Sequence, residues 1–123
     1  MADSREEQIV EVLRELRADH PGVQTAVLIS SDAMPLASDM AEVMDEEVIS
    51  ATVSALISAS ERVARELDTG DVEQVYLRGG SGDLVIAKVN ENAVLACTVN
   101  HQAKMGMTLM EVNRCAGRLA AII

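Results

Sequence analysis

Apolar side chains recur at helical spacing in three segments of the chain, at its start, near its middle and at its end. Ser4 and Glu7 form a capping box that predicts the start of the first helix, and the His-Pro-Gly sequence at residues 20–22 ends it. Thr108 and Glu111 form a second capping box, which is expected to open the last helix. That helix should bury one apolar face, made by Leu109, Val112, Cys115, Ala116, Leu119 and Ile123.

The middle helix is predicted to be the longest, running from an N-cap at Asp45 to about Leu67. Glu46 and Glu47 follow the cap, where the helix dipole favours negative charge. At 100° per residue, one apolar stripe of this helix is expected to face a sheet: Ile49, Val53, Leu56, Val63 and Leu67.

Strand-like runs occupy residues 23–30, 35–38, 72–78, 84–90 and 93–100. Short turns join the strands within each group, and short links require antiparallel pairing. The order is therefore α-β-β-α-β-β-β-α, an α+β sandwich in a single domain over residues 1–123. Its five-stranded antiparallel sheet is expected to lie between the long helix on one side and the two terminal helices on the other.

Charge and composition exclude several classes of function. The chain has 20 acidic and 10 basic residues, a net charge of −10, one Tyr, and no Phe or Trp. A nucleic-acid binder needs a basic surface, and single-strand binders add aromatic platforms, so we expect no nucleic-acid partner. No apolar run is long enough to insert in a membrane, and no secretory signal is visible at the N-terminus. The expected location is the cytoplasm.

Two sets of residues suggest catalysis, and each has a simpler structural interpretation. Cys97 and His101 could belong to a nucleophilic set, but Cys97 shares a strand face with core residues. Asp32 with Ser30 and Ser31 lies where one strand must reverse, and Asp and Ser favour such turns because they bond to nearby backbone. We therefore expect no enzyme and no catalytic residue.

Three closely spaced glycines suggest a phosphate-binding loop. Gly79, Gly80 and Gly82 precede a predicted strand, whereas phosphate loops precede a helix N-terminus, so a hairpin is favoured. The two histidines and two cysteines are too scattered for a metal site. No cofactor or metal is expected.

The back of the long helix carries small residues where a solvent face would carry Lys and Glu. Ala51, Ser54, Ala55 and Ser58 lie there before charged residues resume. Such a surface lets another backbone approach closely and loses little side-chain entropy on contact, which favours a protein-binding face over a weakly patterned solvent face. The third strand carries Val75, Tyr76 and Leu77 without a blunting proline. It is expected to be a sheet edge that pairs with a second copy.

Four sequence stretches together resemble the roadblock family of dynein light chains and GTPase-regulator domains. They are "GVQTAVLISSDAMPLAS", "VSALISASERVARELDTG", "GDLVIAKVNENAVLACTVN" and "KMGMTLMEVNRCAGRLAAII", and the resemblance extends from about residue 9 to residue 123. It implies a profilin-like sandwich that forms a homodimer through its third strands and long helices. It also implies a non-enzymatic regulator of a Ras-like small GTPase.

Carried onto this chain, the family's GTPase platform would consist of Ala51, Ser54, Ala55, Ser58 and Arg62. The alternative is a scaffold subunit of a larger assembly, dynein light chain-like and without GTPase-activating activity. One position departs from the family, which usually has Gly where this chain has Ala33. If that turn needs a positive φ, Ala costs about 1 kcal/mol more than Gly.

Overall fold

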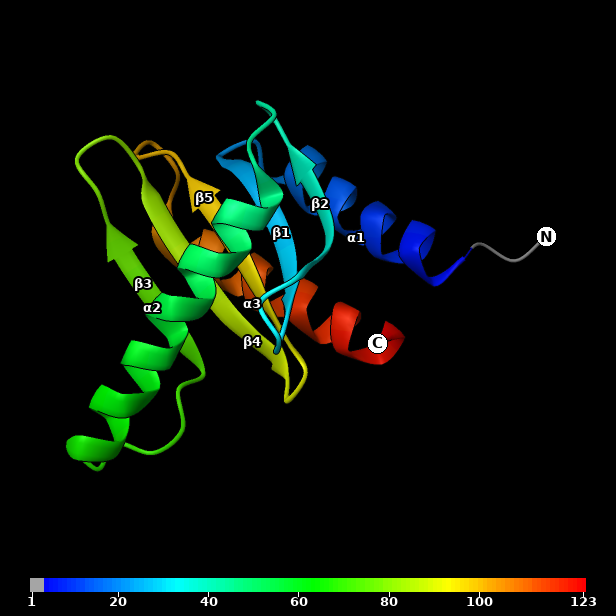
Figure 1. The fold of residues 1–123 in the computed structure, drawn as a ribbon. Coiled ribbons are helices and arrows are strands. Elements are labelled where there is room, and N and C mark those ends of the chain that lie inside the picture. Colours follow the sequence, from blue (N-terminus) through cyan, green and yellow to red (C-terminus); the bar gives the residue numbers. More distant parts are fainter. Residues whose placement is uncertain (1–3) are drawn as a thin grey trace.

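The computed structural model describes residues 4–123 and shows three helices around one sheet (Figure 1). The elements, in chain order, are α1 (Arg5–Asp19), β1 (Val23–Ser30), β2 (Pro35–Met40), α2 (Glu46–Glu66), β3 (Gln74–Arg78), β4 (Asp83–Asn90), β5 (Ala93–Val99) and α3 (Met105–Ile122). This is the predicted α-β-β-α-β-β-β-α order, so the α+β class is confirmed.

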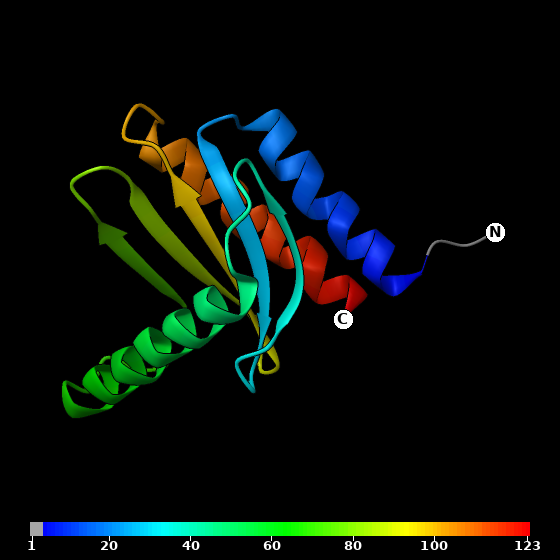
Figure 2. The ribbon, with the colours of Figure 1, turned by 45° about the horizontal axis from the view of Figure 1, so that its top comes forward.

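The five strands form one antiparallel sheet in the order β2-β1-β5-β4-β3. The two strand groups meet where β1 pairs with β5, and β2 and β3 are left as the edges. Helices α1 and α3 cover one face, and α2 crosses the other face alone (Figures 1 and 2). The predicted layers are confirmed.

The face under α1 and α3 carries the larger core. Strand residues Leu28, Val85 and Leu95 pack there against Leu13 of α1 and Leu119 of α3, and all five are fully buried. A fully buried aliphatic side chain of this kind contributes about 1.5–3 kcal/mol relative to an exposed one. The predicted apolar face of the last helix lies in or against this core.

The face under α2 carries a smaller core. Val27 and Ile29 of β1 pack with Ile86 and with Val53 of α2. Asp45 caps α2 as predicted, since its side chain accepts hydrogen bonds from the N–H groups of Glu47 and Val48. The cap places the first turns of the helix over β1 and β2.

Two predictions about the helices are wrong. Val63 and Leu67 do not face the sheet but are 55% and 68% exposed, because the last turns of α2 extend beyond it (Figure 2). Thr108 does not open α3, because the helix starts at Met105 with Lys104 as its N-cap. Thr108 lies in the first turn and donates to the Lys104 carbonyl at 3.0 Å. At the first helix the predicted N-cap is confirmed, since the Ser4 Oγ accepts from the Glu7 N–H.

Strand boundaries differ from the prediction by one or two residues. β3 begins at Gln74 rather than at residue 72, because the chain leaving α2 first curves around its end. The glycine-rich segment is a hairpin as expected, in which the Gly79 N–H donates to the Gly82 carbonyl at 2.9 Å.

The β1–β2 corner is a turn held by its own side chains. Ser30 Oγ bonds to Asp32 and accepts from the Met34 N–H. Ala33 has φ 67°, the left-handed conformation that glycine adopts more readily. The serines and the aspartate therefore shape the corner, and Ala33 holds it at a cost of about 1 kcal/mol.

Candidate functional site

The outward surface of α2 carries four of the five predicted platform residues. Ala51, Ala55 and Arg62 are exposed on it. Ser58 is exposed beside them, and Ser54 is half-buried further around the helix; both serines also border a cavity. The five predicted platform residues thus lie on one helix but divide between an outward face and a cavity wall.

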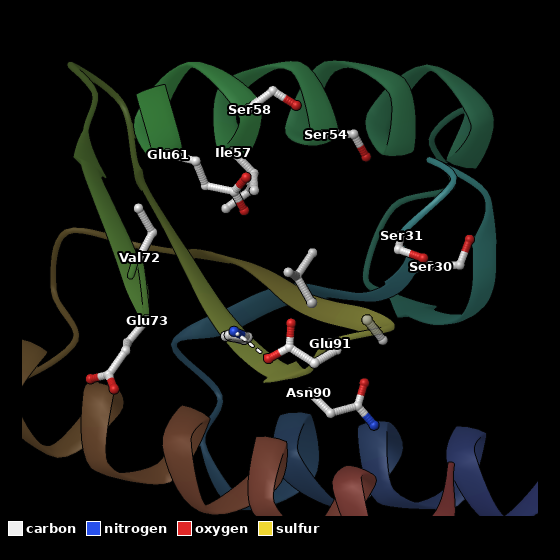
Figure 3. Close-up of a pocket in the computed structure, with 13 residues that line it drawn as sticks. Ser30, Ser31, Ser54, Ile57, Ser58, Glu61, Val72, Glu73, Asn90 and Glu91 are labelled. Carbon is white, nitrogen blue, oxygen red and sulfur yellow. Dashed lines mark hydrogen bonds and ion pairs between the residues drawn. The ribbon is translucent and has the colours of Figure 1, made fainter. Parts of the chain in front are cut away.

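The cavity has a volume of about 260 Å³ and lies between α2, the β1–β2 corner and the β4–β5 hairpin (Figure 3). Four serines line it: Ser30, Ser31, Ser54 and Ser58. Its apolar residues are Ile57, Val72, Ala93 and Val94, and its polar and charged residues are Glu61, Glu73, Lys88, Asn90 and Glu91. Sequence reasoning missed it because its residues come from four separate segments.

β3 is an edge strand, as predicted, and it is only partly covered. Val75 packs in the core under α2. Leu77 lies on the same sheet face two residues later but is 44% exposed, because α2 covers only the start of the strand. Its cross-strand partner Leu84 is also incompletely buried. An apolar strip therefore lies open at the far end of β3.

Tyr76 differs from its two neighbours because it points to the other sheet face. Its hydroxyl donates to Asp83 Oδ2 at 3.0 Å, and Asp83 is only 4% exposed. His101 Nε2 lies 3.2 Å from Asp83 Oδ1 and 2.8 Å from the Gly79 carbonyl oxygen. These contacts tie the edge strand to the hairpin and to the loop after β5.

The two cysteines lack the properties of nucleophiles. Burial raises the pKa of the Cys97 thiol far above its ordinary value. Burial also raises the pKa of Cys115 to about 11, although the charge of Arg118 opposes the shift. Both thiols are protonated near neutral pH and belong to the core, where Cys97 lies beside Leu95 and Val99 as expected.

Two features are absent from residues 4–123: a cluster of metal-ligating side chains and a helix that could span a membrane. No group of three or more His, Cys, Asp or Glu side chains among them is placed to hold a metal ion. No helix in this part of the chain is long and apolar enough to cross a membrane.

The fold and the surface define a class: a small α+β sandwich with one helix-covered face, one incompletely covered face and an open apolar edge. The chain belongs to the Roadblock/LC7 domain family, whose sequence model matches residues 9–99. A relative in sequence is the uncharacterized protein MJ0714 of Methanocaldococcus jannaschii, which is 27% identical over 118 residues, or 95% of this chain and 98% of that protein.

Solved structures show the same fold. MglB in a tetrameric arrangement superposes with a TM-score of 0.90 at 23% identity, over 99% of this chain and 92% of that one. The gliding protein mglB of Thermus thermophilus gives 0.89 at 22% identity, over 99% and 93%. Profilin II of Acanthamoeba castellanii gives 0.65 at 17% identity, over 89% and 94%, as a profilin-like sandwich predicts. At these identities the likeness concerns the fold.

Proposed function

We propose that this protein is a non-enzymatic homodimer that binds a Ras-like small GTPase through α2 and acts in the cytoplasm as a single domain of residues 1–123. The observation that carries the proposal is that α2 covers one sheet face incompletely and presents small, accessible side chains on its outward side. Membership of the Roadblock/LC7 family and the likeness in fold to MglB support it. One MglB structure is described as tetrameric, which is consistent with a domain that associates with its own copies.

Two exposed apolar surfaces explain how the dimer would form. Val63 and Leu67 lie on the part of α2 that extends beyond β3, and Leu77 and Leu84 lie at the far end of the uncovered face. A twofold axis perpendicular to the sheet at β3 would place the end of each α2 over the other copy's uncovered strip. The same surfaces would then cover each other reciprocally, as in any isologous interface.

The backbone of β3 sets the register of that pairing. The Lys88 N–H donates to the Glu73 carbonyl. In an antiparallel pair the residues alternate, so the odd-numbered residues of β3 direct their backbone N–H and C=O groups to β4. Gln74, Tyr76 and Arg78 therefore direct their N–H and C=O groups to the free edge. Pairing Tyr76 with Tyr76 of a second copy satisfies all of these groups and sets Val75 beside Leu77, an apolar pair.

A disulfide measures this register directly. Tyr76→Cys places one thiol from each copy on either side of the proposed twofold axis, at the Cα separation of about 5.5 Å of a hydrogen-bonded antiparallel pair, which a disulfide can span. Mild oxidation should link most of the variant into a dimer, seen on a non-reducing gel. Gln74→Cys is the control, because it would face Arg78 and should stay largely unlinked. Cys97 and Cys115 are buried and add no background. Equal linking of both variants, or of neither, would refute the register.

The GTPase proposal needs a binding measurement. The purified protein is mixed with each Ras-like small GTPase of the same organism, loaded with GDP or with a GTP analogue, and affinity and hydrolysis are measured. Binding that depends on the nucleotide supports the proposal, and no binding to either form leaves the scaffold alternative. Ala55→Arg should abolish binding, whereas Asn113→Arg, an exposed position on α3, should leave it unchanged. Unchanged binding by Ala55→Arg would remove α2 from the interface.

A further inference from the structure

We propose that the cavity beside α2 is a binding site for an arginine side chain presented by a partner protein. The site differs from the outward platform of Ala51, Ala55 and Arg62, because it lies on the flank of the helix that faces the β4–β5 hairpin (Figure 3). Its walls combine apolar side chains, hydroxyls and carboxylates, and each group matches one part of the arginine side chain.

The apolar part of the wall suits an alkyl chain. Ile57 of α2, Val72 of the following loop and Val94 of β5 line the same cavity from three sides. Long basic side chains bury their methylene groups against such surfaces while the charged end stays in a polar environment. A ligand with an apolar stem and a polar end fits this lining better than a small ion does.

The polar part of the wall is rich in acceptors. Glu61 descends from α2 and Glu91 rises from the hairpin, and Figure 3 shows both carboxylates directed into the space between the two elements. Ser31, Ser54 and Ser58 line the same space, and the side chain of Ser54 is directed into it (Figure 3). A guanidinium group carries five N–H donors in a planar fork and is weakly hydrated, so it can bridge acceptors on two elements at once.

The local charge is negative even though the cavity has one cation of its own. Lys88 Nζ is already paired with Glu91 Oε1 at 2.9 Å. The hydrogen bond to Glu91 and its charge raise the pKa of Lys88, and the charges of Asp71 and Glu61 add to the effect. Since Glu61 is also directed into the cavity, two carboxylates, those of Glu61 and Glu91, outnumber its single ammonium group (Figure 3). This charge balance favours a cationic occupant over an anion such as phosphate.

The test uses N-acetyl-arginine N-methylamide, whose only charge is the guanidinium group. Titration into the isotopically labelled full-length protein, followed by amide NMR shifts, should show saturable millimolar binding. Its largest shifts should lie at the cavity residues from α2, the β1–β2 corner and the hairpin. The citrulline analogue, equal in shape but uncharged, should give no saturable shifts there. Equal responses to both compounds, or no response to the arginine compound, would overturn the proposal. The second result is also expected if the second copy in the dimer fills the cavity, and the proposal fails in that case too.

Two substitutions should change the affinity in opposite directions. Glu61→Gln should weaken binding about three- to fivefold, the loss expected for one solvent-accessible charge pair. Lys88→Met should strengthen it by a similar factor, because it releases Glu91. Glu66→Gln is the matched control on the same helix, outside the cavity lining, and should have no effect. A Glu61→Gln variant that binds like wild type would contradict the site.

This measurement does not depend on the GTPase proposal, because it needs no protein partner. If the arginine compound binds and no GTPase does, the cavity serves another partner with an exposed arginine. If a GTPase binds but the arginine compound does not, the platform stands and this inference fails.

Discussion

The two faces of the sheet differ in how much apolar surface their helices bury. Under α1 and α3 the core contains 18 buried apolar residues, whereas under α2 it contains only five. On the first face, α1 packs over β1 and β2 and α3 packs over β4 and β5, whereas the second face is crossed by one helix that leaves β3 early (Figure 1). The difference separates two roles: one face stabilises the protomer, and the other keeps apolar surface available for association.

Removing a buried side chain from the closed face should have the largest effect. Leu28→Ala deletes a fully buried side chain on the interior strand β1, and the surrounding core cannot collapse to fill the space. We expect a loss of about 2–5 kcal/mol in the free energy of unfolding, measured by urea denaturation. Leu77→Ala is the counterpart on the open face.

The loss of unfolding free energy should depend on protein concentration in Leu77→Ala but much less in Leu28→Ala. In a monomer Leu77 is 44% exposed, so its truncation should cost less than about 1 kcal/mol at low protein concentration. At concentrations where the dimer forms, the cost should rise, because the second copy buries the side chain. A Leu77→Ala effect as large as that of Leu28→Ala at every concentration would show that both faces are equally complete.

A charge on the overhanging part of α2 should break association and leave the protomer folded. Val63→Glu introduces a carboxylate that the dimer would bury twice, once in each symmetry-related contact. We expect the dimer dissociation constant to rise at least about 100-fold, or about 2.7 kcal/mol, by sedimentation. Met110→Glu is the control, since Met110 is similarly exposed but lies on α3. Loss of the dimer in both variants would argue against the α2 interface.

Much of this architecture could be predicted from the sequence. The element order and the edge position of β3 follow from periodicity and short turns, and the caps at Ser4 and Asp45 follow from local chemistry. Local chemistry also misled at Thr108, where the same box motif occurs one turn inside a helix that had already begun. Periodicity identified which side of a helix is apolar, but Val63 and Leu67 show that it cannot tell how far the sheet extends beneath it.

The candidate site was predictable only in part, for the same reason. Ala51 and Ala55 are exposed on the predicted helix, and β3 is the predicted edge. The cavity depends on the distance between α2 and the β4–β5 hairpin, which no local pattern encodes. The positions of Glu61 and Glu91 on its two walls therefore became visible only in three dimensions.

The hydrogen bond of Tyr76 on the face covered by α1 and α3 tests how strongly the edge strand β3 is held. Its hydroxyl is the donor to the buried Asp83 Oδ2, so Tyr76→Phe leaves a carboxylate oxygen without that partner. We expect a loss of about 1–2 kcal/mol in unfolding free energy. In a double-mutant cycle with Asp83→Ala, which removes the acceptor, the two effects should not add. Additive effects would mean that the hydrogen bond does not stabilise the hairpin.

The smallest predicted effect concerns the buried hydroxyl of Ser50, which differs from that of Thr108 on the other face of the sheet. Thr108, on the closed face, donates to a backbone carbonyl, but Ser50 is fully buried under α2 and its Oγ has no partner among residues 4–123. Ser50→Ala should therefore stabilise the protein, because it removes a hydroxyl that folding takes out of water without compensation.

Helix propensity alone also favours Ala over Ser, by about 0.5 kcal/mol, so the effect needs a matched control. Ser54→Ala gives the same propensity gain one turn later on α2, at a half-buried position. Ser50→Ala should exceed it by about 1 kcal/mol in urea denaturation. If Ser50→Ala instead destabilises the protein, its hydroxyl has a partner in solution, and α2 is held on its sheet by more than apolar contact.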